Sequence, residues 1–309
     1  MRDLVRRGGL MERALVGPVL RAARPNFLTL TPVCVLIGIG VAIQTQAHVS
    51  VGDCLLVLCG ALLAHISVNL LNEYDDFRSG LDSLTVRTPF SGGSGSLPSH
   101  PEAAAATLAA GLLCLGATAA VGLYFVYEKG IALLPLGLAG LVLVVAYTPL
   151  VTRRPLLCLL APGIGFGPLM VVGTAFVLGE RYSWIALVAS MAPLCLVSEL
   201  LLINQFPDID ADRQVGRRHL PIVVGRRRSA VLFGVLIIAA FSTVAIGVAG
   251  AILPPLALLA LLPVPAGIFL ARQVYVLADD LPRLIPYLGI NVAMIHVTLL
   301  LLAIGLLFG

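Results

Sequence analysis

Long runs of apolar residues alternate with short polar segments along almost the whole chain. Nine of these runs are close to the length of about 20 residues at which a helix crosses a bilayer. They span residues 27–45, 54–72, 103–125, 130–150, 156–178, 184–204, 230–252, 253–271 and 287–308. The runs are continuously apolar, whereas the strands of a membrane barrel alternate in short segments. The pattern therefore predicts an all-α polytopic membrane protein, a bundle of about nine transmembrane helices.

The composition and the charge distribution support this topology. Of the 309 residues 59% are hydrophobic and 12% are charged, about half the charged fraction of a soluble domain. With nine spans, only Lys129 and Arg181 among the 20 basic residues fall on the side opposite the N-terminus. Because basic loops stay in the cytoplasm, we expect a multi-pass protein of the cell's inner (plasma) membrane, with its N-terminus inside and its C-terminus outside. The net charge of +4 reflects this topology, and we expect no nucleic-acid partner.

The first 24 residues differ from the rest of the chain. Arginines alternate there with single apolar residues, namely Leu4, Leu10, Leu15, Val19 and Leu20. This pattern predicts a basic amphipathic segment on the cytoplasmic membrane surface, and the lack of a continuous apolar core argues against a signal peptide. Residues 25–309 are then expected to form a single transmembrane domain.

Two long cytoplasmic loops begin with acidic residues directly after an apolar run. The first reads NEYDDFRSG from Asn72, and the second reads NQFPDIDADRQVGRR from Asn204. The spacing Asn72-x-x-x-Asp76 recurs 132 residues later as Asn204-x-x-x-Asp208. This weak internal repeat predicts two helical halves, each with one aspartate-rich cytoplasmic loop. The halves comprise residues of about 25–150 and 151–309.

The spacing within these loops predicts a metal site. Residues four apart share one face of a helix, so Asn72 points with Asp76, and Asn204 with Asp208 and Asp212. Carboxylate and amide oxygens suit Mg²⁺, which often completes its coordination with substrate phosphates. Acids that only solvate helix ends are the alternative, but two matched loops on one membrane face favour a metal–diphosphate site. Four arginines at this interface are candidates for binding phosphate: Arg24, Arg87, Arg217 and Arg218.

These residues resemble the two aspartate-rich motifs of the UbiA superfamily of intramembrane aromatic prenyltransferases. The flanking stretches RTPFSGGSG (87–95), AYTPL (146–150) and FGPLMVVGT (166–174) are similar to the MenA-like branch, which prenylates 1,4-dihydroxy-2-naphthoate in menaquinone biosynthesis. RPNF (24–27) resembles the start of the family's first helix. The chain departs from the family pattern at Glu73, where Asp is usual, and at Gly80, where many members carry a second Asp. APGIG (161–165) also replaces a Gly-Leu-Gly-Glu-like stretch.

The resemblance implies an enzyme, a membrane polyprenyl transferase that ionises an allylic polyprenyl diphosphate. The prenyl chain passes to a small aromatic acceptor, while metal and arginine charge stabilise the leaving group and apolar walls exclude water. Asp76, Asp208 and Asp212 are the implied catalytic residues. Two Mg²⁺ ions are implied, held by Asn72, Asp76, Asp82, Asn204, Asp208 and Asp212. Tyr147 and Arg153 are implied contacts of the diphosphate or the cation, although an interfacial aromatic residue and a topology-setting arginine explain this pair equally well.

Three further features have two readings each. His65 and Asn69 lie on the Asn72 face, deeper in the membrane, and are expected to support Asn72; hydrogen bonding between helices explains them as well. Glu199 lies about 180° from Asp208 on an ideal helix, so we expect a neutral, hydrogen-bonded carboxyl there, with a base for the acceptor as the alternative. SGGSG (91–95) lacks the lysine of a phosphate-binding loop, which favours a flexible lid over the site.

Other functions remain compatible with this pattern. One alternative keeps the fold and the ionisation chemistry but changes the nucleophile: a 4-hydroxybenzoate-like or homogentisate-like acceptor, a glycerol phosphate ether lipid, or terpene cyclisation. A secondary transporter would also carry repeats and membrane carboxylates, but its acids should lie near the midplane, whereas these cluster at one interface. The expected partners are a polyprenyl diphosphate, a small aromatic acceptor and the lipid bilayer. The sequence predicts neither the prenyl length nor the oligomeric state.

Overall fold

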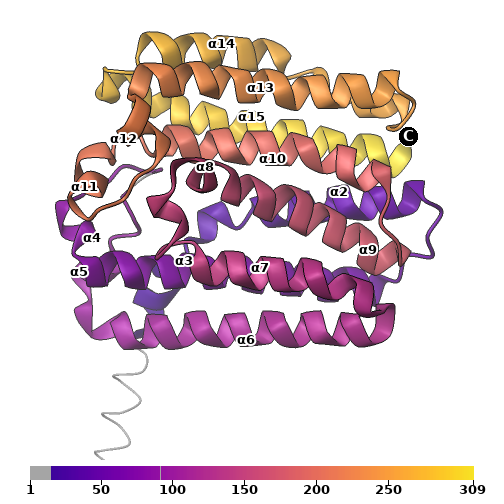
Figure 1. The fold of residues 1–309 in the computed structure, drawn as a ribbon, viewed down its shortest axis with the longest axis horizontal. Helices are drawn as coiled ribbons and strands as arrows, with labels where there is room; N and C mark the ends of the chain where they lie inside the picture. The colour runs from indigo at the N-terminus through magenta and orange to yellow at the C-terminus, as the bar shows by residue number, and fades with distance from the viewer. Residues whose placement is uncertain (1–14, 91) are drawn as a thin grey trace, which may run out of the picture.

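The computed structural model describes residues 15–90 and 92–309, which contain helices and loops but no strand (Figure 1). The amphipathic segment expected over residues 1–24 lies outside the described residues up to position 14. Residues 15–22 form a helix that exposes Val16 and Leu20. Its other face buries Ala22 and Ala23 against Leu70 of the bundle. The helix thus packs one face on the protein and exposes the other, while its place on the cytoplasmic membrane surface stays a prediction.

The long helices follow the predicted order along the chain. They are α2 (Leu30–Gln44), α3 (Val51–Ser79), α6 (Ala104–Lys129), α7 (Leu134–Ala146), α8 (Pro155–Ile164), α9 (Gly173–Gly179), α10 (Trp184–Asn204), α13 (Arg226–Ala249), α14 (Val264–Val276) and α15 (Leu281–Phe308). A wider π-helical segment, η5 (Gly165–Val172), joins α8 to α9, and η6 (Pro255–Leu261) leads into α14. Four short helices lie in the loops: α4 (Leu81–Leu84), α5 (Ser96–Ser99), α11 (Ile209–Gln214) and α12 (Leu220–Val224).

The number of membrane spans agrees approximately with the prediction. Among the described residues, seven helices are long and apolar enough to cross a membrane, and an eighth is the pair Leu15–Phe27 and Leu30–Gln44, which is bent by 50°. The span expected over 130–150 corresponds to the shorter apolar helix Ile131–Ala146. The proline-rich run expected over 253–271 extends to Val276. The all-α, multi-pass architecture is confirmed, while the division into two repeated halves stays a prediction.

The most apolar packing surrounds α10, which lies among α2, α8, α13 and α15 (Figure 1). Helix α6 lies at the edge of the bundle, on the side away from α13 and α14, and contacts mainly α3 and α7. Of the span in α10, 67% is buried inside the protein, against 11% of the span that contains α6. The outer helices therefore present most of their apolar side chains to lipid, as expected where the bilayer is the solvent.

Two glycines let the helix over α8 and η5 lie directly against α10. A methyl group on Gly163 would approach Leu194 O to 2.1 Å, and one on Gly167 would approach Ser190 O to 2.4 Å. Pro162 and Pro168 lie in the same stretch, where missing backbone donors favour a π-helical widening. This local irregularity turns Phe166 and Met170 toward the cavity described below.

The two ends of the bundle differ in charge. Lys129 forms ion pairs with Asp53 (3.1 Å) and Glu180 (3.3 Å), and the Arg181 guanidinium donates to Thr45 O at 3.0 Å. The aspartate-rich loops and the four short helices lie at the other end, on the left in Figure 1. Lys129 and Arg181, the two basic residues predicted on the side opposite the N-terminus, thus lie at the end of the bundle away from the aspartate-rich loops.

Candidate active site

A cavity of about 970 Å³ is lined at one end by residues of the two aspartate-rich loops and continues between the helices. All six predicted metal ligands line it, although they come from three separate segments of the chain. These residues are Asn72, Asp76, Asp82, Asn204, Asp208 and Asp212. The structure therefore brings the two motifs together, as the prediction of one shared site requires.

Helix geometry places the first motif, and a tight turn completes the second. Asn72 and Asp76 lie one turn apart near the end of α3, and Gly80, in the left-handed conformation (φ +78°), ends that helix. Helix α11 ends before Gly216, whose φ of +80° lets the chain turn back so that Arg217 N–H donates to Asp212 O at 3.0 Å. This turn returns the Arg217 side chain to the aspartates.

Arg217 is the electrostatic link between the two motifs. Its guanidinium forms ion pairs with Asp76 and, at 3.0 Å, with Asp212. The second Asp212 oxygen lies 2.8 Å from His219 Nε2. Arg217, Asp76 and Asp212 are all largely buried, with side-chain exposures of 17%, 8% and 4%. Arg217 therefore neutralises carboxylates that would otherwise be buried without a counter-charge.

Three other site oxygens have no partner in the described part of the chain. They are Asp82 Oδ2, Asn204 Oδ1 and Asp208 Oδ1, and all are buried. A buried oxygen without a hydrogen bond is costly, and these are carboxylate and amide oxygens, the donors that Mg²⁺ prefers. Within the described residues, no three His, Cys, Asp or Glu side chains converge into a set that could hold a metal ion by themselves. The donor set therefore fits Mg²⁺ that is completed by substrate phosphates better than a closed protein cage.

Glu73 ties three segments together behind the metal face. Its buried carboxylate accepts from the Arg24 guanidinium at 2.8 Å, and from the Ser94 backbone N–H at 3.1 Å. The Ser94 hydroxyl also donates to it. Arg24, just before Pro25, is held with a positive φ of 52°, a conformation that non-glycine residues rarely adopt. Glu73 thus links α3 both to Arg24, at the start of the first span, and to Ser94, in the glycine-rich loop of residues 92–95 (the glycine loop).

Gly92 and Gly93, from the glycine-rich loop of residues 92–95, line the cavity beside the aspartates. Gly93 has a φ of +71°, and a methyl group on it would lie 2.8 Å from Asp82 Oδ1. A methyl group on Gly95 would lie 2.2 Å from the Arg87 guanidinium. The Gly92 backbone forms a hydrogen bond with the Asp208 carboxylate. Glycine is therefore required for this close backbone approach, while the function of the loop as a lid stays a prediction.

Burial changes the acidity of two site carboxyls. It raises the pKa of Asp82 to about 7, with further contributions from the negative charges of Glu73 and Asp76. Burial also raises the pKa of Asp208 to about 7, assisted by the charge of Asp212. Each carboxyl therefore binds a proton for part of the time near neutral pH until a cation lowers its pKa.

The predicted diphosphate ligands divide into two groups. Arg24, Arg217 and Tyr147 line the cavity. Arg87, Arg153 and Arg218 do not, and all three are exposed at the same end of the bundle. Asn72 accepts from Arg24 at 3.3 Å and donates to the Thr148 hydroxyl at 3.1 Å, so its amide is oriented by one predicted residue, Arg24, and by Thr148, which the sequence pattern did not select.

The polar residues deeper in the membrane behave differently from one another. His65 and Asn69 line the cavity and hydrogen bond to Thr31 and Ala23 rather than to Asn72. Glu199 does not line the cavity, and its carboxyl accepts from Asn291 at 2.8 Å. This hydrogen bond fits the expectation for Glu199, which lies away from the metal face.

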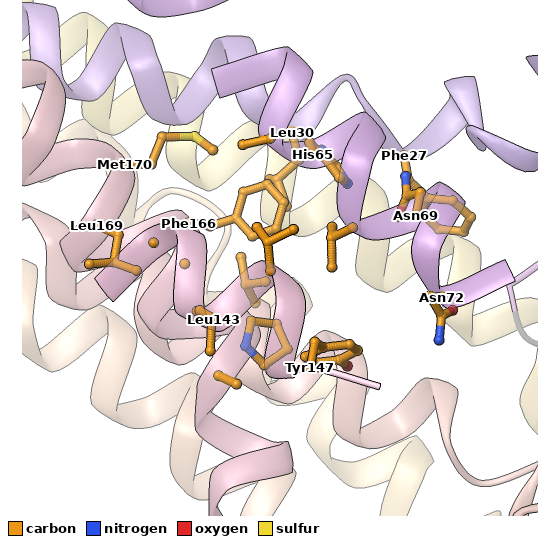
Figure 2. Close-up of a pocket in the computed structure, with 18 of the residues that line it drawn as sticks. Phe27, Leu30, His65, Asn69, Asn72, Leu143, Tyr147, Phe166, Leu169 and Met170 are labelled. Atoms are coloured by element: carbon orange, nitrogen blue, oxygen red, sulfur yellow. The ribbon is translucent and has the colours of Figure 1, made fainter. Parts of the chain in front are cut away.

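The cavity becomes apolar away from the aspartates. It runs along α3 from Asp76 to Val57, which are 19 positions apart and therefore separated by about 28 Å of helix. Its far end is lined by Phe125, Leu133 and Val177. Figure 2 shows its middle part, where Leu143, Phe166 and Leu169 face the His65 side of α3. A charged head and a long hydrocarbon tail can both be accommodated.

Two functional candidates were missed by pattern reasoning. His219 lies seven positions after Asp212, across the Gly216 turn, and only the folded turn brings it to that carboxylate. Glu73 appeared in the sequence as an irregular motif residue, one position outside the metal face. The signal for Glu73 in the sequence is an acid directly after Asn72, on a different helix face from the candidate metal ligands. A Ser- and Gly-rich stretch follows later in the same loop, at residues 91–95.

Comparisons with known proteins agree with this geometry. The sequence pattern of the UbiA prenyltransferase family matches residues 32–295. A 1,4-dihydroxy-2-naphthoate octaprenyltransferase of Bacillus subtilis (strain 168) is 28% identical over 248 residues, which cover 78% of this chain and 76% of that protein. A protein of the same name from Mycobacterium tuberculosis (strain ATCC 25618 / H37Rv) is 29% identical over 267 residues, with coverages of 79% and 85%.

Solved structures share the fold at low sequence identity. A UbiA homologue from Aeropyrum pernix K1 superposes with a TM-score of 0.60 at 20% identity, covering 87% of this chain and 95% of that one. A homologue from Archaeoglobus fulgidus, bound to DMAPP and Mg²⁺, gives a TM-score of 0.57 at 12% identity, with coverages of 93% and 99%. At these identities the similarity establishes the common helical architecture.

Proposed function

The chain belongs to the UbiA prenyltransferase family and is a membrane polyprenyl transferase; from this premise we propose that it transfers a polyprenyl chain to 1,4-dihydroxy-2-naphthoate in a Mg²⁺-dependent reaction. The observation that carries the proposal is the convergence of both aspartate motifs on one end of a long apolar cavity. The names of the two relatives support the acceptor. The Archaeoglobus homologue with DMAPP and Mg²⁺ supports the metal.

The proposed roles follow from the site. Asn72, Asp76, Asp82, Asn204, Asp208 and Asp212 would hold two Mg²⁺ ions, which supply positive charge to the diphosphate oxygens as the allylic C–O bond breaks. Arg24 and Arg217 are the cavity arginines that would bind the same oxygens. For this, Arg217 has to exchange a carboxylate partner for a phosphate. We restrict the diphosphate role to the residues that line the cavity, with Tyr147 beside the reacting carbon.

The remaining contribution that we propose for the protein is the exclusion of water from the reacting carbon. The apolar walls around Leu143 and Phe166 would protect the allylic cation from water, so that the electron-rich acceptor ring attacks it first. The ring carbon that gains the prenyl chain would lose its carboxylate as CO₂, which restores the aromatic ring, and pyrophosphate leaves from the prenyl chain. The glycine loop over Asp82 and Asp208 limits solvent access from the cytoplasmic end. By the distribution of basic residues this end is cytoplasmic and the C-terminus lies outside.

The decisive test uses purified protein in detergent with Mg²⁺, a labelled polyprenyl diphosphate and 1,4-dihydroxy-2-naphthoate. We expect a prenylated naphthalene product together with pyrophosphate. Pyrophosphate without that product would keep the ionisation chemistry and reject the acceptor. Neither signal from folded protein, with several prenyl lengths, would reject the prenyl transfer reaction at this site.

The raised pKa values of Asp82 and Asp208 predict a pH-dependent requirement for Mg²⁺. Metal binds the carboxylate form and displaces the proton. The apparent Mg²⁺ affinity should therefore rise from pH 6 to pH 8 and level off above the pKa values near 7. Below them it should fall about tenfold per pH unit for each proton displaced. Mg²⁺ titrations of turnover at several pH values measure this; EDTA should abolish turnover throughout, and a pH-independent Mg²⁺ requirement would contradict the prediction.

A further inference from the structure

The cavity contains polar atoms that a prenyl diphosphate does not use. Its tail has no hydrogen-bonding group, and its diphosphate belongs with the aspartates. Asn69 and His65 nevertheless line the cavity, about one and two turns deeper along α3 than Asn72 (Figure 2). A polar wall at this depth calls for a second ligand that carries polar groups.

Each of these two side chains has one atom fixed by the protein and one atom free. His65 Nδ1 lies 2.8 Å from the hydroxyl of Thr31, which is fully buried. The Asn69 amide donates to Ala23 O at 3.0 Å, which fixes its Nδ2 and turns Oδ1 the other way. Within the described residues, neither His65 Nε2 nor Asn69 Oδ1 has a hydrogen-bond partner.

The free atoms match the chemistry of ring hydroxyls. Asn69 Oδ1 only accepts, so its ligand has to donate. His65 Nε2 donates or accepts according to the direction of the Thr31 hydrogen bond, and a hydroxyl satisfies either state. The two residues are four positions apart, which corresponds to about 6 Å along the helix, comparable to the separation of para hydroxyls across one ring.

Aromatic side chains frame the same place. The His65 and Phe166 rings meet edge to face with centroids 4.9 Å apart. Phe27 lies beside Asn69, and Tyr147 lies near Asn72 (Figure 2). A flat aromatic ligand placed here would pack against these rings, one helical turn along α3 from the candidate metal ligand Asn72.

We propose that His65 and Asn69 form the acceptor subsite and position a dihydroxyarene through its ring hydroxyls. This inference rests on the proposed function and names the residues that select its second substrate. Both act by hydrogen bonding and orientation, so they set acceptor affinity and leave prenyl diphosphate binding to the aspartates.

The test compares His65→Phe and Asn69→Leu with the unaltered protein. Each substitution keeps approximate side-chain volume and removes the free polar atom. We expect KM for 1,4-dihydroxy-2-naphthoate to rise about tenfold or more in each, while KM for the polyprenyl diphosphate changes less than about twofold. The matched control is His296→Phe, because His296 also lines the cavity but both ring nitrogens are bonded, to Val292 O (2.8 Å) and the Thr29 hydroxyl (3.0 Å).

A cycle with methylated acceptors identifies the contact itself. For one of the two mono-O-methyl ethers of 1,4-dihydroxy-2-naphthoate, KM should be about tenfold higher than for the parent acceptor with the unaltered protein. The increase should be much smaller with Asn69→Leu, because Asn69 Oδ1 only accepts and both changes therefore remove the same hydrogen bond. The subsite would be overturned if the effects of O-methylation and of the substitution on KM were additive. It would also be overturned if the substitutions raised KM equally for the acceptor and for the polyprenyl diphosphate. Unaltered protein that does not prenylate this acceptor would overturn the proposed function and the subsite together. Normal transfer with unaffected variants would overturn the subsite alone.

Discussion

Replacement of Asp208 by asparagine is expected to lower turnover by about 10²–10³-fold, the range seen when one pre-organised charge-stabilising group is removed from an active site. Asparagine keeps the shape of the side chain and can still accept from the Gly92 backbone. It loses the negative charge that a metal ion requires. Steady-state turnover at saturating prenyl diphosphate measures the effect, and raised Mg²⁺ should recover only part of it.

Asp210→Asn is the matched control for this change. Asp210 lies two positions away in α11, but its side chain is 81% exposed and its nearest cation is Arg213 at 3.9 Å. An exposed pair of this kind contributes little, so turnover and stability should match those of the unaltered protein. Equal losses at Asp208 and Asp210 would indicate a general effect of charge in the loop and would remove Asp208 from the metal site.

Substitution of Arg217 by glutamine should produce two separable effects. Without Mg²⁺, loss of the guanidinium leaves Asp76 and Asp212 buried without their main cation. Breaking a buried ion pair in this way costs about 3–5 kcal/mol, so the thermal midpoint should fall. Turnover should fall by about 10²-fold because a charge on the leaving group is missing.

Mg²⁺ distinguishes these two effects. Because the metal supplies positive charge to the same carboxylates, saturating Mg²⁺ should raise the thermal midpoint of Arg217→Gln more than that of the unaltered protein. It should not restore turnover. Arg213→Gln, at an arginine whose side chain is 59% exposed, should change neither quantity. A variant of Arg217 with normal stability in EDTA would show that the aspartates do not need its charge.

Local periodicity explains why so much of the site could be predicted. Asn72 and Asp76 are neighbours on α3 because a helix repeats every 3.6 residues, and that spacing is visible in the sequence. The helical class and the all-apolar spans follow from composition for the same reason, since only internally bonded helices satisfy the backbone in lipid over such long runs. The inference that both motifs share one interface followed from counting spans, and the fold confirms that they meet.

Other features depended on contacts that no local pattern encodes. Arg217 pairs with Asp76 across 141 positions of sequence, and the pairing requires the left-handed turn at Gly216. The distinction between Arg217 at the site and the exposed Arg218 beside it arises from that turn. In the sequence, Glu73 is only a departure from the family motif. The fold shows that its carboxylate binds Arg24 and Ser94.

The helical membrane architecture, the uneven distribution of basic residues and the six candidate metal ligands that line one cavity could all be predicted from the sequence, because each depends on residue type and on spacing within one helix. Packing between helices fixes which arginines line the cavity, which glycines lie against Asp82 and Asp208, and which atoms of His65 and Asn69 have no partner among the described residues. Those outcomes depend on packing between helices, where one backbone turn or one glycine contact determines which side chains meet.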